Sequence, residues 1–211
     1  MNHIVYIVDE DNDCRKKLTH FLDASGFNTM SFHSAEIFLK HNFADLPSCV
    51  VLETLFRRLS GFEVCDIVRE TTPETSLIFL TSNSDIYTAV SAIKGGAYDF
   101  LTKPFNEEHL HESIQSALAV SAANLDSMKE CNSLKNRYMS LTPREYQVLN
   151  LVLDGNLNKQ IASKLGISEV TVKVHRRRIM FKMQSQSVAE LARDVERLGR
   201  KCTLFNRNNL Y

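Results

Sequence analysis

The chain has 211 residues, 44% of them hydrophobic and 24% charged, which is the composition of a globular protein and excludes a low-complexity chain. No apolar run approaches the roughly 20 residues of a membrane span, and the start MNHIVYIVDED lacks the features of a signal peptide, so we expect a cytoplasmic protein with no membrane partner. The formal net charge is zero, but the two parts of the chain differ in sign. Residues 1–140 carry 12 Lys+Arg and 19 Asp+Glu, whereas residues 141–200 carry 11 Lys+Arg and 6 Asp+Glu. We therefore expect two domains with different partners.

Short apolar runs alternate with segments of helical period over residues 1–120. We predict strands at 4–8, 28–32, 49–52, 76–81 and 98–101, and helices at 12–24, 34–42, 61–71 and 85–94, with a long helix from about Asn106. Five strand–helix units in succession predict the α/β class, with a doubly wound five-stranded parallel sheet and helices on both faces. Right-handed crossovers then place the carboxyl ends of all the strands along one edge.

Residues 107–139 have helical periodicity and contain neither Pro nor Gly. The apolar content falls after Leu125, and the segment DSMKECNSLKNRY is polar. We therefore predict a connecting segment over residues 121–140, either an exposed helix or a flexible linker.

From Leu141 onward the pattern is of helices alone. Thr142 and Glu145 form a capping box, with Pro143 at the first helical position. We predict helices at 143–153, about 157–164, about 169–183 and from the capping box SVAE (187–190) to about residue 198, with a turn at LGIS after the second. A tight pair of helices with Gly in the turn is typical of a helix-turn-helix unit, so we expect a small all-α domain over 141–200 and a tail over 201–211.

Polar side chains gather where the predicted strands end. Asp9 and Glu10 follow the first strand, Glu53 follows the third, Thr81 ends the fourth, and Lys103 follows the fifth. In a doubly wound sheet these residues converge on one crevice. Carboxylates, a hydroxyl and an ammonium suit a phosphoryl group beside Mg²⁺, with Asp9 and Glu10 as the candidate metal ligands. Arg57 competes for the same acids, so the sequence leaves the metal site open.

The third helix of the second domain has two unlike faces at about 100° per residue. An inner stripe is expected to pack into the core, and it consists of Val172, Ile179 and Met183. The opposite stripe places Val174 between Lys173 and Arg177, which suits a DNA major groove, where Lys or Arg binds guanine and Val contacts a thymine methyl. Arg176 lies nearer the inner stripe, where Glu145 is its alternative partner.

Further polar residues flank this face. We expect contacts with the phosphates of double-stranded DNA from the flank of the third helix and the start of the second, namely Thr171, Arg178, Lys182, Asn158 and Lys159. The alternative interpretation of these cations is a basic face that only contacts solvent. The apolar Val174 within that face favours DNA contact instead.

The motifs IVDED, FLTS and DFLTKPF resemble the receiver domain of bacterial response regulators. Residues 141–198 resemble a LuxR-type helix-turn-helix, and together the two parts resemble the NarL/FixJ type, the FixJ side most closely. The resemblance implies a flavodoxin-like fold for residues 1–120, Phe100 as the aromatic switch residue and a cis bond from Lys103 to Pro104. It also implies a transcriptional regulator, not an enzyme, that dimerises on DNA through its fourth helix, although core packing is an equal first interpretation of that helix.

The sequence departs from this family pattern at Glu53, because the family has an Asp there as its phosphoryl acceptor. Glutamate moves the carboxylate outward by about 1.5 Å, toward the space of the phosphoryl group, where it can meet Lys103 or Arg57. We therefore predict a receiver that is not phosphorylated by a sensor kinase and is fixed in an active-like state.

Three alternatives stay open beside this one. A conventional phosphorylation-dependent regulator would tolerate Glu53. An interaction module would bind DNA only secondarily. A phosphatase of the haloacid-dehalogenase type would fit VDEDND, but it needs an acidic cluster after a further strand that is missing beyond Lys103.

Overall fold

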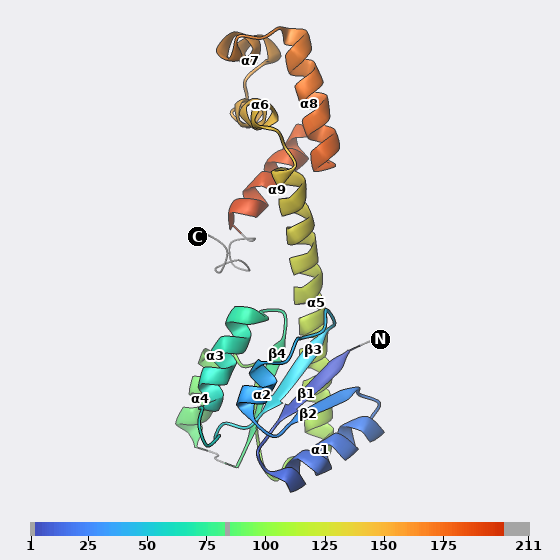
Figure 1. Ribbon diagram of the computed structural model, residues 1–211, viewed down its shortest axis with the longest axis vertical. Coiled ribbons are helices and arrows are strands. Elements are labelled where there is room, and N and C mark those ends of the chain that lie inside the picture. The colour runs from blue at the N-terminus through green and yellow to red at the C-terminus, as the bar shows by residue number, and fades with distance from the viewer. Residues whose placement is uncertain (1–2, 83–84, 201–211) are drawn as a thin grey trace. The chain divides into compact units, whose positions relative to one another are not determined.

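The computed structural model describes residues 3–82 and 85–200. The chain divides into two compact units, residues 1–127 and 128–211 (Figure 1), and each is described by itself. The predicted tail, 201–211, lies outside the described residues.

The first unit is a parallel five-stranded sheet in the order β2-β1-β3-β4-β5. The doubly wound α/β fold class predicted from the sequence is confirmed. Its elements are β1 (Ile4–Val8), α1 (Asn12–Ala24), β2 (Thr29–Phe32), α2 (Ala35–Leu39), β3 (Ser48–Leu52), α3 (Gly61–Thr71), β4 (Ser76–Thr81), α4 (Ile86–Lys94), β5 (Asp99–Thr102) and α5 (Glu107–Met139).

The sheet separates two hydrophobic cores because successive side chains of a strand point to opposite faces. On β1, Tyr6 and Val8 pack with residues of α2, α3 and α4, whereas Val5 and Ile7 pack with residues of α1 and α5. Figure 1 shows the same division, with α3 and α4 on one face of the sheet and α1 and α5 on the other. All these strand side chains are buried, which explains why the strands read as continuous apolar runs.

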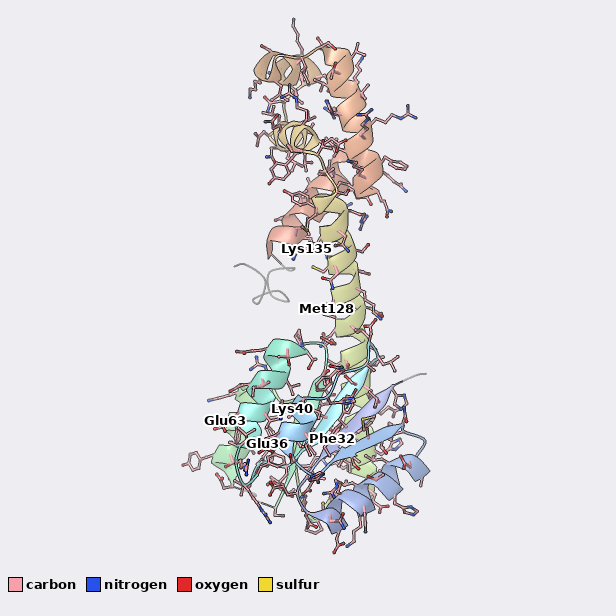
Figure 2. The ribbon with its side chains drawn as sticks, viewed as in Figure 1. Phe32, Glu36, Lys40, Glu63, Met128 and Lys135 are labelled. Atoms are coloured by element: carbon pink, nitrogen blue, oxygen red, sulfur yellow. The ribbon has the colours of Figure 1, made fainter. Side chains whose placement is uncertain are left out.

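The start of α3 lies against the end of β3. A Cβ atom added at Gly61 would lie 2.8 Å from the Cα of Thr54, so only glycine allows this approach. Ser60 and Glu63 form a capping box that begins α3, and Figure 2 labels Glu63 on that helix. The loop after β3 is therefore held at both ends.

Helix α5 contributes to both units. Leu110 and Ile114 are buried in the core that α1 shares, whereas Leu134 is buried among residues of the second unit. Figure 2 labels Met128 and Lys135 on the second part of this helix. The segment predicted to connect the domains, 121–140, is helical as far as Met139, and the two units divide within it.

The second unit packs the end of α5 with α6 (Pro143–Leu153), α7 (Asn158–Leu165), α8 (Glu169–Met183) and α9 (Val188–Arg200). Gly166 ends α7 with φ +63°, the left-handed conformation that a helix-turn-helix turn uses. Leu191 of α9 is buried in this core, so α9 packs within the unit. No helix in the described part of the chain combines the length and the apolarity that crossing a membrane demands.

Candidate functional site

A crevice forms at β1, where the order of the parallel strands reverses. Strand β1 pairs with β2 on one side and with β3 on the other. Ligand sites of doubly wound sheets lie at the carboxyl ends of strands at such a point. Asp9 follows β1 and is 4% exposed, and Glu53 follows β3, where its backbone N–H donates to the carbonyl of Val8 at 3.1 Å.

Lys103 joins the two carboxylates. Its ammonium donates to Asp9 Oδ2 at 2.6 Å and to Glu53 Oε2 at 2.7 Å. Exposed fractions of 15%, 6% and 13% for the three side chains remove most of the solvent screening that weakens surface ion pairs. The peptide bond between Lys103 and Pro104 is cis, as the motif predicts.

Thr54 extends this network to Thr81. Glu53 Oε1 accepts from the backbone N–H of Thr54 at 2.7 Å and from its hydroxyl at 3.1 Å. The hydroxyls of Thr54 and Thr81 lie 2.7 Å apart. Thr54 was not predicted from the sequence, although its place directly after Glu53 at a strand end was a signal.

The ionisation of Glu53 reflects these contacts. Burial raises the pKa of Glu53, but hydrogen bonds from Lys103 and Thr81 and the charge of Lys103 outweigh it, so the pKa lies below its usual value. Burial lowers the pKa of Lys103, and its hydrogen bonds to Asp9 and Glu53 outweigh that effect, so this pKa is raised. Both groups are therefore charged at neutral pH.

Glu10 is separated from the other acids by Arg57. Glu10 Oε1 accepts from the backbone N–H of Arg57 at 3.2 Å, and its Oε2 lies 3.5 Å from the guanidinium Nε. Asp9 Oδ1 accepts from the backbone N–H of Asp11 at 2.8 Å. Protein donors thus occupy the carboxylates, and in the portion of the chain that the structure covers no three His, Cys, Asp or Glu side chains are grouped to hold a metal ion. In this arrangement Lys103 pairs with Asp9, and Arg57 pairs with Glu10.

Phe100, the predicted switch residue, is half-buried on β5. It packs against the core that contains Phe79, with ring centroids 6.3 Å apart. The crevice therefore brings together Asp9, Glu53, Thr81 and Lys103, whereas Glu10 and Phe100 lie beside this group with other partners.

In the second unit, α8 presents the two faces that its sequence predicts. Val172, Ile179 and Met183 are buried. Lys173, Arg177 and Arg178 are exposed, and Val174 is 44% exposed between them. Two further apolar side chains of this helix, Val170 and Phe181, are 70% and 84% exposed and were missed by the sequence analysis.

Glu145, the alternative partner that the sequence suggested for Arg176, pairs with another residue. Lys182 donates to Glu145 Oε2 at 2.6 Å and to the carbonyl of Ser140 at 2.9 Å. Arg176 instead donates to Asn158 Oδ1 at 3.0 Å. Lys182 lies six residues beyond Arg176 on α8, where its ammonium reaches the start of α6.

The remaining predicted contact residues lie at the starts of α7 and α8. The Thr171 hydroxyl lies 2.8 Å from that of Ser168, which caps α8. Asn158 holds Arg176 as described, and Lys159 is exposed beside it. Exposed cations around an apolar residue on one helix face can contact both phosphates and base edges of DNA.

Comparisons with known proteins assign a family to each of the two units. Residues 5–115 match the model of the response regulator receiver domain, and residues 139–195 match that of the bacterial regulatory proteins of the luxR family. The chain is 40% identical over 195 residues to the response regulator protein TodT of Pseudomonas putida, covering 92% of this chain and 86% of TodT. It is 34% identical to the transcriptional regulatory protein FixJ of Bradyrhizobium diazoefficiens, over 92% of this chain and 95% of FixJ.

A solved structure of the response regulator StyR is similar along both units. It is 38% identical, with a TM-score of 0.82 over 93% of this chain and 100% of StyR.

Proposed function

Because the chain belongs to the response regulators with a receiver domain and a LuxR-type DNA-binding domain, we propose that Glu53 occupies the place of the phosphoryl acceptor and sets the receiver without phosphorylation. The protein is a DNA-binding transcriptional regulator and not an enzyme. The observation that carries the proposal is the hydrogen bond from Lys103 to Glu53 at 2.7 Å, beside Thr81.

Glu53 makes a poor acceptor for geometric reasons. Phosphoryl transfer requires the attacking oxygen to be in line with the donor, and misplacement by about 1 Å can cost on the order of 10²-fold in rate. One carboxylate oxygen of Glu53 is held by Lys103 and the other by Thr54, so neither is free to attack. A sensor kinase is therefore not part of this proposal.

The cation requirement changes with the acceptor. Receiver domains commonly bind Mg²⁺. Here the ammonium of Lys103 pairs with both Asp9 and Glu53, and Arg57 pairs with Glu10, so two cations offset part of the charge of three carboxylates. We propose that these two side chains supply the positive charge in place of a metal.

Labelling with acetyl phosphate tests the acceptor assignment. We expect no acid-labile phosphoryl group on wild-type Glu53 by intact-mass spectrometry, whereas Glu53→Asp gains partial labelling because the shorter carboxylate withdraws from Lys103. Labelling of the wild type would favour the alternative, a conventional phosphorylation-dependent regulator.

Glu53→Gln tests the fixed charge. The amide keeps the shape but loses the ion pair with Lys103, so we expect weaker dimerisation or DNA binding if the carboxylate holds the active-like arrangement. Sedimentation and gel-shift measurements of both proteins check this. Unchanged values in both assays would refute the claim that the charge of Glu53 sets the receiver.

We propose that α8 enters the major groove with Lys173, Val174 and Arg177 toward the base edges. Their exposure on one face supports this assignment. Thr171, Asn158, Lys159 and Arg178 are proposed to contact phosphates. Lys182 is withdrawn from this set because Glu145 and Ser140 already hold its ammonium.

Salt-dependent gel shifts separate the two kinds of contact. Lys173→Ala should weaken specific binding by about 1–3 kcal/mol and relax preference at one base pair. Arg178→Ala should weaken binding to all sequences alike and lower the salt slope by about one. Equal loss of specificity in both variants would mean that the helix docks with another face.

We propose that the protein is a homodimer that pairs through the outer face of α4. Ile86, Val90 and Ile93 are 78%, 46% and 49% exposed at helical spacing, beside the exposed Tyr87 and Tyr98. Exposed apolar side chains grouped on one helix face are typical of a protein interface, and a second copy presents the same face. Val90→Glu should shift sedimentation toward the monomer. A variant that still sediments as a dimer would show that this face does not form the dimer. The face would then be available to a different protein, as in the interaction-module alternative.

A further inference from the structure

Beyond the acid crevice, the receiver has a basic hollow of about 540 Å³. Its cations are Lys40, which caps the end of α2, and Arg57 and Arg58 in the loop between β3 and α3. Residues 1–127 contain nine Lys and Arg against eighteen Asp and Glu, so three of nine cations gather at one place in an acidic domain. Such a group of cations on an acidic domain is a candidate site for an anion.

Two of these cations are uncommitted. Arg58 and Lys40 are exposed, and neither has a hydrogen bond or an ion pair within the described ranges 3–82 and 85–200. Arg57 pairs with Glu10, but its side chain is 90% exposed, and exposed pairs contribute at most about 1 kcal/mol. A ligand can therefore recruit all three without breaking a buried contact.

Two carboxylates, Glu10 and Glu36, also line the hollow and offset part of the positive charge of its three cations. Glu36 Oε2 accepts from the Ser34 hydroxyl at 2.8 Å, so its carboxylate is turned toward its own helix start. Its own backbone N–H, Ser34 and the charges of Arg58 and Lys40 hold the pKa of Glu36 below its usual value. Figure 2 labels Glu36 on α2, Lys40 directly after that helix and Phe32 at the end of β2.

We propose that this hollow binds a small dianion of the phosphate-monoester type. Guanidinium groups match phosphate oxygens in paired hydrogen bonds, and an ammonium adds a point charge. The volume lies within the roughly 300–1,000 Å³ of small-molecule sites. Binding turns Arg57 from Glu10 toward the ligand, which links the hollow to the acid crevice.

Calorimetric titration of the full-length protein with inorganic phosphate and with glycerol 3-phosphate, at constant ionic strength, tests the proposal. We expect saturable binding of both anions. Arg58→Glu and Lys40→Glu should each weaken it at least about tenfold, the scale of one lost charge-assisted hydrogen bond of about 1.5–3 kcal/mol. Glu10→Gln should strengthen it, because Arg57 is then released.

Lys17→Glu is the matched control, since Lys17 is an exposed lysine on α1 outside the hollow. It should bind both anions as the wild type does. Non-saturable binding, or equal weakening in Lys17→Glu and Arg58→Glu, would overturn the proposal. So would binding that Arg58→Glu and its milder counterpart Arg58→Gln leave unchanged, because the anion would then sit elsewhere. Without ligand, Arg58→Glu should bind DNA normally, which separates this inference from the function of α8.

Discussion

Replacing Lys103 by methionine removes the cation between two buried carboxylates. Asp9 and Glu53 would then face each other with side chains only 6% and 13% exposed. Removing one partner of a buried ion pair typically costs about 3–5 kcal/mol, because the remaining charge loses its compensation. Thr54 still donates to Glu53, so we expect a loss near the lower end, about 3 kcal/mol in the free energy of unfolding at pH 7.

The loss should depend on pH with a definite sign. In the wild type the pKa of Glu53 is lowered, so its stabilisation is complete above its unfolded value and is lost only as the pH falls through the folded one. Without Lys103, burial and the charge of Asp9 raise the pKa of Glu53 instead. The free energy of unfolding of the variant should therefore rise as the pH falls from 7 to 5. Over the same range, the contribution of Glu53 to the stability of the wild type should not change.

Urea unfolding of the full-length protein, followed by circular dichroism, measures both effects, with the receiver transition fitted separately. Lys16→Met, an exposed lysine of α1, serves as the control and should stay within about 0.5 kcal/mol of the wild type. The double variant Lys103→Met/Glu53→Gln should lose less than the sum of the single changes. A deficit below about 1 kcal/mol, or one that does not change with pH, would refute the reasoning that Lys103 compensates both buried charges.

Lys182→Ala should destabilise the second unit by about 3 kcal/mol in thermal unfolding, because the buried Glu145 loses its ion pair and keeps only the hydrogen bond from the backbone N–H of Thr142. A variant of normal stability whose DNA binding depends less steeply on salt would show instead that Lys182 contacts DNA. A fragment of residues 128–211 should fold and bind DNA. A shorter fragment of residues 138–211 should be less stable by about 2–5 kcal/mol, because it lacks the buried Leu134 and the hydrogen bond from Arg137 to the carbonyl of Met183. Equal melting temperatures of the two fragments would contradict this. Gly61→Ala should lower the urea midpoint of the receiver, because its methyl group meets the backbone of Thr54; an unchanged midpoint would show that α3 moves freely away from β3.

The sequence determined the fold class and most members of the crevice by itself. Five apolar runs separated by helical segments allow one parallel sheet, and the carboxyl ends of its strands share an edge. Asp9, Glu53, Thr81 and Lys103 therefore had to come near one another. In the same way, a period of about 3.6 residues was enough to place Val172 and Ile179 of α8 in the core.

Only the tertiary structure decided which charge pairs with which. Periodicity reports burial, which is a property of one element, whereas an ion pair depends on the distance between two elements after they pack. A long basic side chain reaches several acids from one backbone position, so the sequence could not tell that Lys182, and not Arg176, meets Glu145. For the same reason the packing of α2 beside the loop after β3, which brings Lys40 and Arg58 to one hollow, is visible only in three dimensions.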